Sequence, residues 1–397
     1  MGTSVLIGLT RSWLGWLLVI GFVSVASCST VSFYGQALRG QVEILVNREA
    51  VSQVISSPNT TAVRRQALIE VGSILDFAGN TLALPAQGRY MRVAEINRRY
   101  VVWNVVAADL LSIEPLARCY PLIGCTAYRG YFTIEGAARE ANRLQHLGYD
   151  VHVSGVAAYS TLGWFDDPLL STFLDWPVER LAELLFHELA HVLVYEAGDS
   201  AFNEAYASFV GERGVKRWLE ERGGDVEVYR LRRQGRDRLD NYLIAWRERL
   251  RRLYVGETSE ETKIERKRWA MQEIGQCYHR HRVLLGAGRF DAYMEAPFNN
   301  ARLAQVATYG YWVPAFEALF SAAREDWKIF HADVLALSEL PRDERDERML
   351  QLSEEEKAKT RNDHGTEQIE CQPFSDHSID AEATGGKHDQ IWSGRDG

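Results

Sequence analysis

The chain has 397 residues, of which 46% are hydrophobic and 25% are charged, as expected for a folded globular protein of one large or two ordinary domains. Eleven Trp and seventeen Tyr argue against disorder over most of this length. The formal net charge is −9, so electrostatics give no reason to expect a nucleic acid as a partner.

The first 27 residues have the pattern of a bacterial export signal. No charged side chain occurs in residues 12–38, and the apolar stretch Trp13–Val25 is shorter than the roughly 20 residues that a bilayer span needs. Small residues precede Cys28, as in the lipobox, whose cysteine becomes the lipidated first residue of the mature protein. We therefore predict a signal peptide over residues 1–27 and a membrane anchor through a lipid on Cys28; a plain signal anchor is the alternative. Ser29 follows the cysteine, which by resemblance to Gram-negative lipoproteins favours the outer membrane, facing the periplasm.

Residues 61–148 are expected to form several helices with short breaks. Cys119 and Cys125 lie in this range and are separated by a short segment that contains a proline. In an oxidising periplasm this pair can close a small disulfide loop, and two buried thiols are the alternative. Cys277 has no evident nearby partner, and Cys371 lies in the C-terminal tail, where it can stay free.

Residues 150–159 are rich in Val, alternate in part, and predict one or two short strands, followed by a loop over 160–173. Part of this segment, Gly155–Thr161, is placed to bind a peptide by strand addition, since its small residues would let a backbone approach. A strand buried inside the sheet is the alternative reading.

The next segment predicts a strongly amphipathic helix. Pro177 lies in its first turn, and Gly198 is placed to end it. A second helix is expected over residues 201–220, capped by Asp199 or Ser200. In the first helix, apolar residues recur at spacings of three and four and form one stripe: Leu181, Leu184, Leu185, Leu189, Val192 and Leu193.

Residues 223–285 predict a helical hairpin, and residues 309–335 are again apolar and helical. From residue 354 to residue 397 the sequence turns polar and shows no periodic apolar face, so we expect a disordered tail. We assign residues 28–353, including the hairpin, to one domain.

His187, Glu188 and His191 form an HExxH motif inside the amphipathic helix. Residues four apart share one face of a helix, so the two imidazoles can bind one metal ion, as zinc sites require. In zinc peptidases of this pattern, the carboxylate beside the first histidine takes a proton from the attacking water and passes it to the leaving amine. A helix with these three residues on a solvated face is the alternative, but their neighbours are apolar, and a half-buried imidazole without a partner is costly.

A zinc ion in such a site needs a third protein ligand. Glu204 is the candidate, because His191 lies seven residues before Gly198 and Glu204 lies six after it. In an antiparallel helix pair these positions have similar heights and can face each other. Glu196 and Asp199 are the weaker alternatives.

These residues and their surroundings resemble a bacterial family of zinc aminopeptidases with many lipoprotein members. The resemblance implies a peptidase with one zinc ion held by two histidines and a glutamate. With the elements expected above, we predict an α+β fold that is mostly α-helical. Its zincin-like core would have a small sheet upstream of the HExxH helix and the helical hairpin downstream. The matching motifs are YGQA at 34–37, GQ at 40–41, YVVWNV at 100–105, YRGYF at 128–132, AYSTLGWF at 158–165, FHELAH at 186–191, GD at 198–199, FNE at 202–204, NNARL at 299–303 and VPAF at 313–316.

A tetrahedral intermediate needs a hydrogen-bond donor besides the metal. Tyr159 and Tyr309 are our candidates for this catalytic role, although aromatic residues in such apolar contexts more often belong to the core. Tyr311, Arg129 and His279 are further possible donors.

The sequence therefore predicts a peptidase with a peptide substrate, and the resemblance alone makes it an aminopeptidase. An exopeptidase needs a group to hold the substrate ammonium, for which Asp166, Asp167 and Glu196 are available. Two alternatives stay open: a hydrolase for a non-peptide amide of the cell envelope, and a metal-binding scaffold lipoprotein. The intact Glu188 argues against a scaffold, which has no need of a base beside its first ligand.

Overall fold

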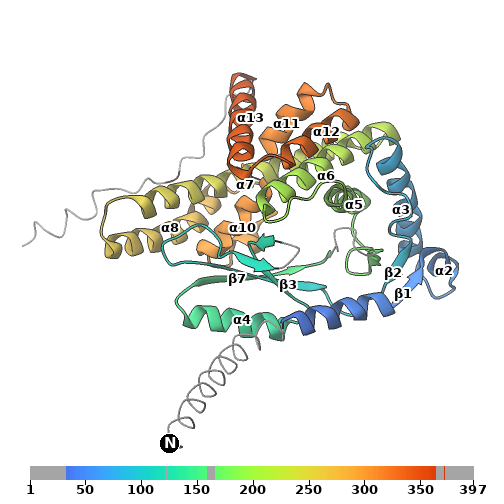
Figure 1. Ribbon diagram of the computed structural model, residues 1–397, viewed down its shortest axis with the longest axis horizontal. Coiled ribbons are helices and arrows are strands. Elements are labelled where there is room, and N and C mark those ends of the chain that lie inside the picture. Colours follow the sequence, from blue (N-terminus) through green and yellow to red (C-terminus); the bar gives the residue numbers. More distant parts are fainter. Residues whose placement is uncertain (1–32, 121–123, 159–165, 311, 364–370, 372–397) are drawn as a thin grey trace, which may run out of the picture.

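The computed structural model describes residues 33–120, 124–158, 166–310, 312–363 and 371 (Figure 1). Within these ranges, none of the helices combines the length and the apolar character that a transmembrane span requires. Cys28 and Tyr159, and the side chain of Tyr309, lie outside the described residues, so their predicted roles stay predictions. The same holds for Tyr311.

The N-terminal part forms one side of the molecule. A helix over residues 33–46 leads into a three-stranded sheet with the order β1-β2-β8, in which β1 is antiparallel and β8 parallel to β2. The elements of this part are β1 (Arg48–Ala50), α2 (Val51–Ser56), α3 (Ala62–Asn80), β2 (Arg92–Ala94) and β8 (Leu169–Leu170).

A second sheet has the order β6-β3-β7, and all of its pairs are antiparallel. α4 packs on one face of this sheet and α10 (Asn300–Gly310) packs on the other. A separate β4-β5 hairpin is closed by a disulfide between Cys119 and Cys125. The elements are β3 (Val102–Ala108), β4 (Arg118–Tyr120), β5 (Gly124–Thr126), β6 (Arg129–Tyr131), α4 (Ile134–His146) and β7 (Asp150–Val156).

The prediction of several helices with short breaks over residues 61–148 is wrong between residues 92 and 131, where the regular elements are the strands β2 to β6. The physical reason is clearest in β3. Val105 and Ala107 pack in the cluster under α4, whereas Val106 and Ala108 pack against Ala301 of α10. A strand buried on both faces has a continuous apolar run, which periodicity cannot distinguish from a buried helix.

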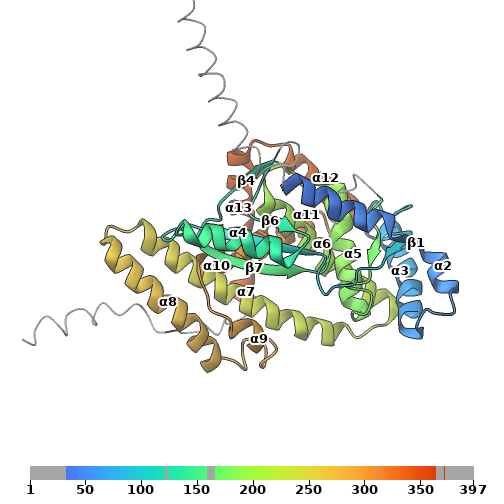
Figure 2. The ribbon, with the colours of Figure 1, turned by 90° about the horizontal axis from the view of Figure 1, so that it is seen from below.

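The C-terminal part is helical, which confirms the mostly helical α+β class. The predicted helical hairpin corresponds to α7 and α8, which lie to one side of α5 and α6 (Figure 2). The helices are α5 (Val178–Leu193), α6 (Ser200–Arg222), α7 (Val226–Val255), α8 (Glu260–Arg280), α9 (Asp291–Met294), α10 (Asn300–Gly310), α11 (Val313–Ala322), α12 (Trp327–Ser338) and α13 (Arg342–Asp363).

The predicted disordered tail, residues 354–397, begins with a helix. α13 runs to Asp363, so residues 354–363 are helical, as i, i+3 and i, i+4 charge pairs such as Glu356–Lys359 favour. Further on, Cys371 is buried and forms a disulfide with Cys277 of α8, so neither is the unpaired cysteine that the sequence suggested. Their separation of 94 residues hides this pairing from any local reading.

Candidate metal centre

Three side chains converge where α5 crosses α6. The Nε2 atoms of His187 and His191 lie 3.1 Å apart. The Oε2 atom of Glu204 lies 3.3 Å from Nε2 of His187 and 3.6 Å from Nε2 of His191. Among the described residues, these three form the one group of three or more potential ligands with the spacing of a metal site. His191 is buried, and His187 and Glu204 are largely so.

The donor atoms fit a tetrahedral ion. Ligands about 2.05 Å from a zinc ion at tetrahedral angles would be roughly 3.3 Å from one another. The three distances of 3.1, 3.3 and 3.6 Å bracket this value. Two imidazole nitrogens and one carboxylate oxygen are also the donor types that zinc takes in open, catalytic sites.

The amphipathic pattern of α5 explains its orientation. Leu181, Leu185 and Leu189 are fully buried and hold one face of the helix in the main core. His187 and His191 lie on the flank of this stripe, where they face α6. The helix ends at Leu193, earlier than expected, and Gly198 adopts a φ of +90° in the connecting loop instead of ending the helix.

Two glycines let α5 and α6 approach closely. A Cβ atom on Gly211 would lie 2.9 Å from the backbone oxygen of Glu183 and 3.5 Å from Cβ of His187. A Cβ atom on Gly214 would lie 2.8 Å from the ring of Phe186. A larger residue at Gly211 would therefore push the ligand-bearing helices apart, and one at Gly214 would displace the ring of Phe186.

The loop between the helices is fixed by side-chain hydrogen bonds. The amide of Asn203 donates to the backbone oxygen of Glu196 at 2.7 Å and accepts from its backbone N–H at 2.8 Å. Asp199 caps α6 by accepting from the N–H of Phe202. Its second oxygen accepts two hydrogen bonds, at 2.9 and 3.2 Å, from Arg345 of α13, which is itself buried. The start of the helix that carries Glu204 is thus held from two sides.

The electrostatics of the group are those of a cation site. Burial would raise the pKa of Glu204, but the charge of His191 and hydrogen bonds from both histidines lower it. Burial would lower the pKa of His187, but the hydrogen bond to Glu204 and the charges of Glu204 and Glu188 raise it. Burial raises the pKa of Glu188 itself, and the two histidines offset part of this shift.

The structure adds neighbours that the sequence did not single out. The Tyr195 ring lies 6.5 Å from the His191 ring, centroid to centroid, in an edge-to-face arrangement. Its position, four residues after His191, continues the spacing that pairs the two histidines, and this signal was available in the sequence. Buried Tyr90 has a pKa raised by burial and then by the charges of Glu188 and Asp167. No sequence pattern links Tyr90 to the motif.

The other predicted residues fall into different places. Asp167 is buried, and its charge contributes to the raised pKa of Glu188, whereas Asp166 is exposed and lies near Arg48 and Arg92. Arg129 stacks on Phe33, and His279 is exposed on α8 beside Tyr278, so both serve other contacts.

The segment Gly155–Thr161, which the sequence places to bind a peptide, lies only in part within the described residues. β7 ends at Val156, and the space beside Gly155 is taken by the ring of Tyr100, so that glycine serves packing on this face. Tyr159 to Thr161 lie outside the described residues.

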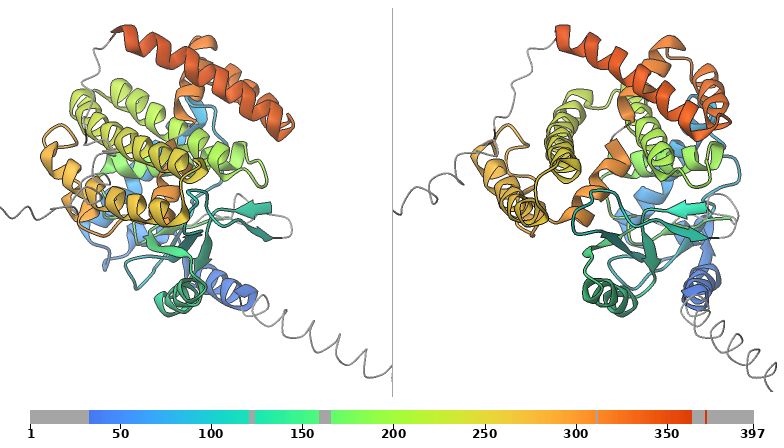
Figure 3. Two further views of the ribbon diagram at one scale, coloured as in Figure 1. Left: turned by 90° about the vertical axis from the view of Figure 1, so that its left-hand side faces the viewer. Right: turned by 60° about the vertical axis from the view of Figure 1, so that its left-hand side comes forward.

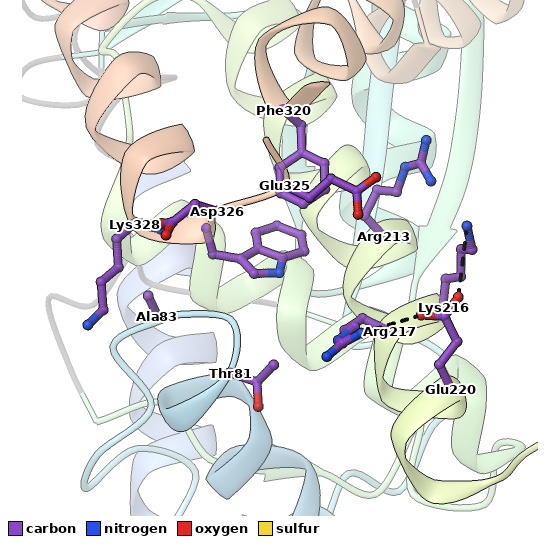
Figure 4. A pocket seen from close by; sticks show the side chains of 11 residues that line it. Thr81, Ala83, Arg213, Lys216, Arg217, Glu220, Phe320, Glu325, Asp326 and Lys328 are labelled. Atoms are coloured by element: carbon purple, nitrogen blue, oxygen red, sulfur yellow. Dashed lines mark hydrogen bonds and ion pairs between the residues drawn. The ribbon is translucent and has the colours of Figure 1, made fainter. Parts of the chain in front are cut away.

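A cavity of about 510 Å³ lies away from the metal group (Figure 4). Its walls come from the C-terminal half of α6, including Arg213 and Arg217, and from the start of α12, including Trp327 and Lys328. Arg213 is paired with Glu317, and Arg217 with Glu221 at 3.0 Å. None of the three potential ligands lines this cavity, so it is not the cleft that serves them.

The family model Aminopep, described as "Putative aminopeptidase", matches residues 32–349, which include all the residues of the metal group. This match confirms the family resemblance seen in the motifs. No curated protein and no solved structure matches the chain, so the zincin-like character of the core stays a prediction.

Glu204 is expected to be the third ligand. Glu196, the weaker alternative from the sequence, is the matched control. Glu204→Gln should weaken zinc binding by more than roughly 100-fold, since even outer-shell partners contribute 10–100-fold. Glu196→Gln keeps the backbone groups that Asn203 binds and should leave zinc affinity unchanged. Isothermal titration with zinc measures both; equal affinities for Glu204→Gln and the unmodified chain would contradict the ligand set.

Gly211→Ala is expected to lower both the free energy of unfolding, by about 1–3 kcal/mol, and the zinc affinity, because its Cβ would collide with the backbone of α5. Gly275→Ala in α8 is the control, since its Cβ would have no atom within 4 Å. That change should stabilise the protein by up to about 1 kcal/mol and leave zinc affinity as it is. Urea unfolding and zinc titration test the pair; identical behaviour of the two variants would show that the close approach is unimportant.

Proposed function

The chain belongs to the Aminopep family, and from this premise we propose that it is a zinc-dependent aminopeptidase whose metal is held by His187, His191 and Glu204. The observation that carries the proposal is the convergence of three ligand atoms directly beside a largely desolvated carboxylate, Glu188. Two imidazoles and a carboxylate favour zinc over harder divalent ions, which prefer oxygen ligands.

The proposed chemistry uses few groups of the chain. A zinc ion bound by the three ligands would polarise the scissile carbonyl and lower the pKa of the attacking water. Glu188 would accept a proton from that water and transfer it to the leaving amine nitrogen as the C–N bond breaks. Burial raises the pKa of Glu188, which makes the carboxylate a better proton acceptor than an exposed one.

Tyr195 is our candidate for the hydrogen-bond donor to the oxyanion. Its ring lies next to His191, and burial followed by the charge of Glu204 raises its pKa, so the phenol stays protonated. A neutral phenol O–H in this place can donate a hydrogen bond to the oxyanion, where negative charge develops in the transition state. It joins Tyr159 and Tyr309 as a candidate for this role.

Asp167 is our candidate for the group that holds the substrate ammonium. It is a buried carboxylate whose charge acts on Glu188 and Tyr90, whereas Asp166 faces solvent. A buried negative charge attracts an ammonium group more strongly than an exposed one, because water screens it less. Hydrolysis from the amino end would follow from this anchor.

Glu188→Gln is expected to lower kcat by about 10²–10⁴-fold while zinc content stays at one ion per chain, because the change removes a proton acceptor and no ligand. Glu179→Gln, in the first turn of the same helix, is the control and should keep full activity. Full-length enzyme loaded with zinc is incubated with a peptide library, and the products are read by mass spectrometry.

Turnover that survives in Glu188→Gln would contradict the mechanism. If the zinc-loaded enzyme cleaves no peptide but cleaves an amide of cell-wall origin, the non-peptide alternative replaces the peptidase. If it cleaves neither, the chain is a metal-binding scaffold.

Asp167→Asn is expected to raise KM for peptides with a free amino end by roughly 10–100-fold, the worth of one charge-assisted hydrogen bond. The neighbouring Asp166→Asn should leave KM unchanged. N-acetylated peptides serve as the second control, because they carry no ammonium group for Asp167 to hold. Internal cuts that are insensitive to Asp167 would keep the zinc mechanism and discard the aminopeptidase assignment.

A further inference from the structure

The N-terminal helix, residues 33–46, carries an apolar stripe that no described residue covers. Tyr34, Leu38, Val42 and Val46 recur every four residues, and 42%, 67%, 47% and 74% of their surfaces are exposed. Residues four apart follow one another along a single side of a helix, so the four side chains form a continuous row. Scattered single apolar residues need no explanation, but a row of four along one helix does.

The opposite side of this helix is already committed to the protein. Ile44 is buried in the main core, and the missing Cβ of Gly40 leaves room for the ring of Phe132. The side chain of Gln36 donates to the backbone oxygen of Gly130 at 3.2 Å and accepts from the N–H of Phe132 at 3.1 Å. These contacts fix the rotation of the helix, so the row cannot turn inward.

The sequence before the helix indicates what covers the row. Residues 12–38 contain no charged side chain, and Cys28, the predicted lipidation site, lies only five residues before the helix begins. The predicted lipid on this cysteine would insert into a bilayer. This anchor would tether the first turn of the helix within a short distance of the membrane surface, where Tyr is a favoured residue.

The charges near the start of the helix also suit a membrane. Arg118, Arg129 and Arg143 surround a single carboxylate, that of Glu140, at 3.5, 3.8 and 2.8 Å. Three guanidinium groups and one carboxylate leave a local excess of positive charge, and half of the Arg143 side chain is exposed. Arg129 stacks on Phe33, which places this cluster at the beginning of the apolar row. Basic groups beside an apolar surface bind bilayers that contain anionic lipids.

Figures 1 and 3 show that the N-terminal helix and α4 lie on the same side of the molecule, opposite α12 and α13. α4 adds exposed Ile134 and Leu147 and the exposed Arg139 to this side. The apolar and basic groups thus share one face of the protein.

We infer that the row Tyr34, Leu38, Val42 and Val46 lies in the surface of an anionic lipid bilayer and sets the orientation of the whole protein on the membrane. The N-terminal helix then acts as an interfacial helix, with one side in the headgroup region and the other in the protein core. This inference does not depend on peptidase activity or on the identity of the metal.

The test uses the full-length chain in vesicles of phosphatidylethanolamine and phosphatidylglycerol. A fluorescent amino acid is incorporated in place of Leu38 or Val42, and in a control protein in place of Ile329, which is similarly exposed on α12. Lipids with a spin label near the headgroup quench a fluorophore that lies in the interface. We expect quenching at positions 38 and 42 at least about twofold stronger than at position 329, because only the first two would enter the interface.

Two results would overturn the inference. Quenching at positions 38 and 42 that equals quenching at position 329 would show that the row stays in water. Weak quenching together with cross-links between two chains at position 42 would show that a second copy covers the row. Circular dichroism spectra and zinc content matching those of the unmodified chain establish that each labelled protein is folded.

Discussion

Glu204 can share an ion with His187 and His191 only because α5 and α6 pack at the distance that glycine allows. Gly211 brings the backbone of α6 against Glu183 and His187, and Gly214 admits the ring of Phe186. The remaining parts of the centre maintain this contact. The apolar stripe of α5 holds one helix in the core, while Asn203 and the Asp199–Arg345 pair hold the start of the other. A metal site needs its ligands placed to within a fraction of an ångström, and this precision comes from packing and hydrogen bonds outside the ligand set.

The metal ligands could be predicted from the sequence better than the residues around them. The reason is that the ligands lie close together in the sequence, whereas their supporting contacts come from distant segments. The pair His187–His191 depends on helix periodicity, and Glu204 follows from one additional assumption, that the chain turns near Gly198. The exact end of α5 was not needed, because Glu204 faces His191 whether the loop begins at residue 194 or 198. Local regularities of this kind can be read from residues alone.

Features that depend on distant segments could not be read in this way. From the sequence, β3 reads as part of a helical region, because its two faces pack against α4 and α10, which the sequence alone does not place beside it. The disulfide between Cys277 and Cys371 spans 94 residues, and Arg345 reaches Asp199 from 146 residues away. Asp199 illustrates the limit well: its cap on α6 was predicted from the residue type, whereas its buried partner was not. The family match then supported the chemistry that the local pattern suggested.

The three ligands lie within a stretch of eighteen residues, from His187 to Glu204, and this has a consequence for the order of folding. Closing so short a loop costs little chain entropy, so the α5–α6 pair has a low contact order compared with the two sheets. Metal can therefore bind while distant partners such as Arg345 are still unstructured, and the bound ion would stabilise the pair at that stage. Metal supply would then influence how fast the native protein appears as well as how active it is.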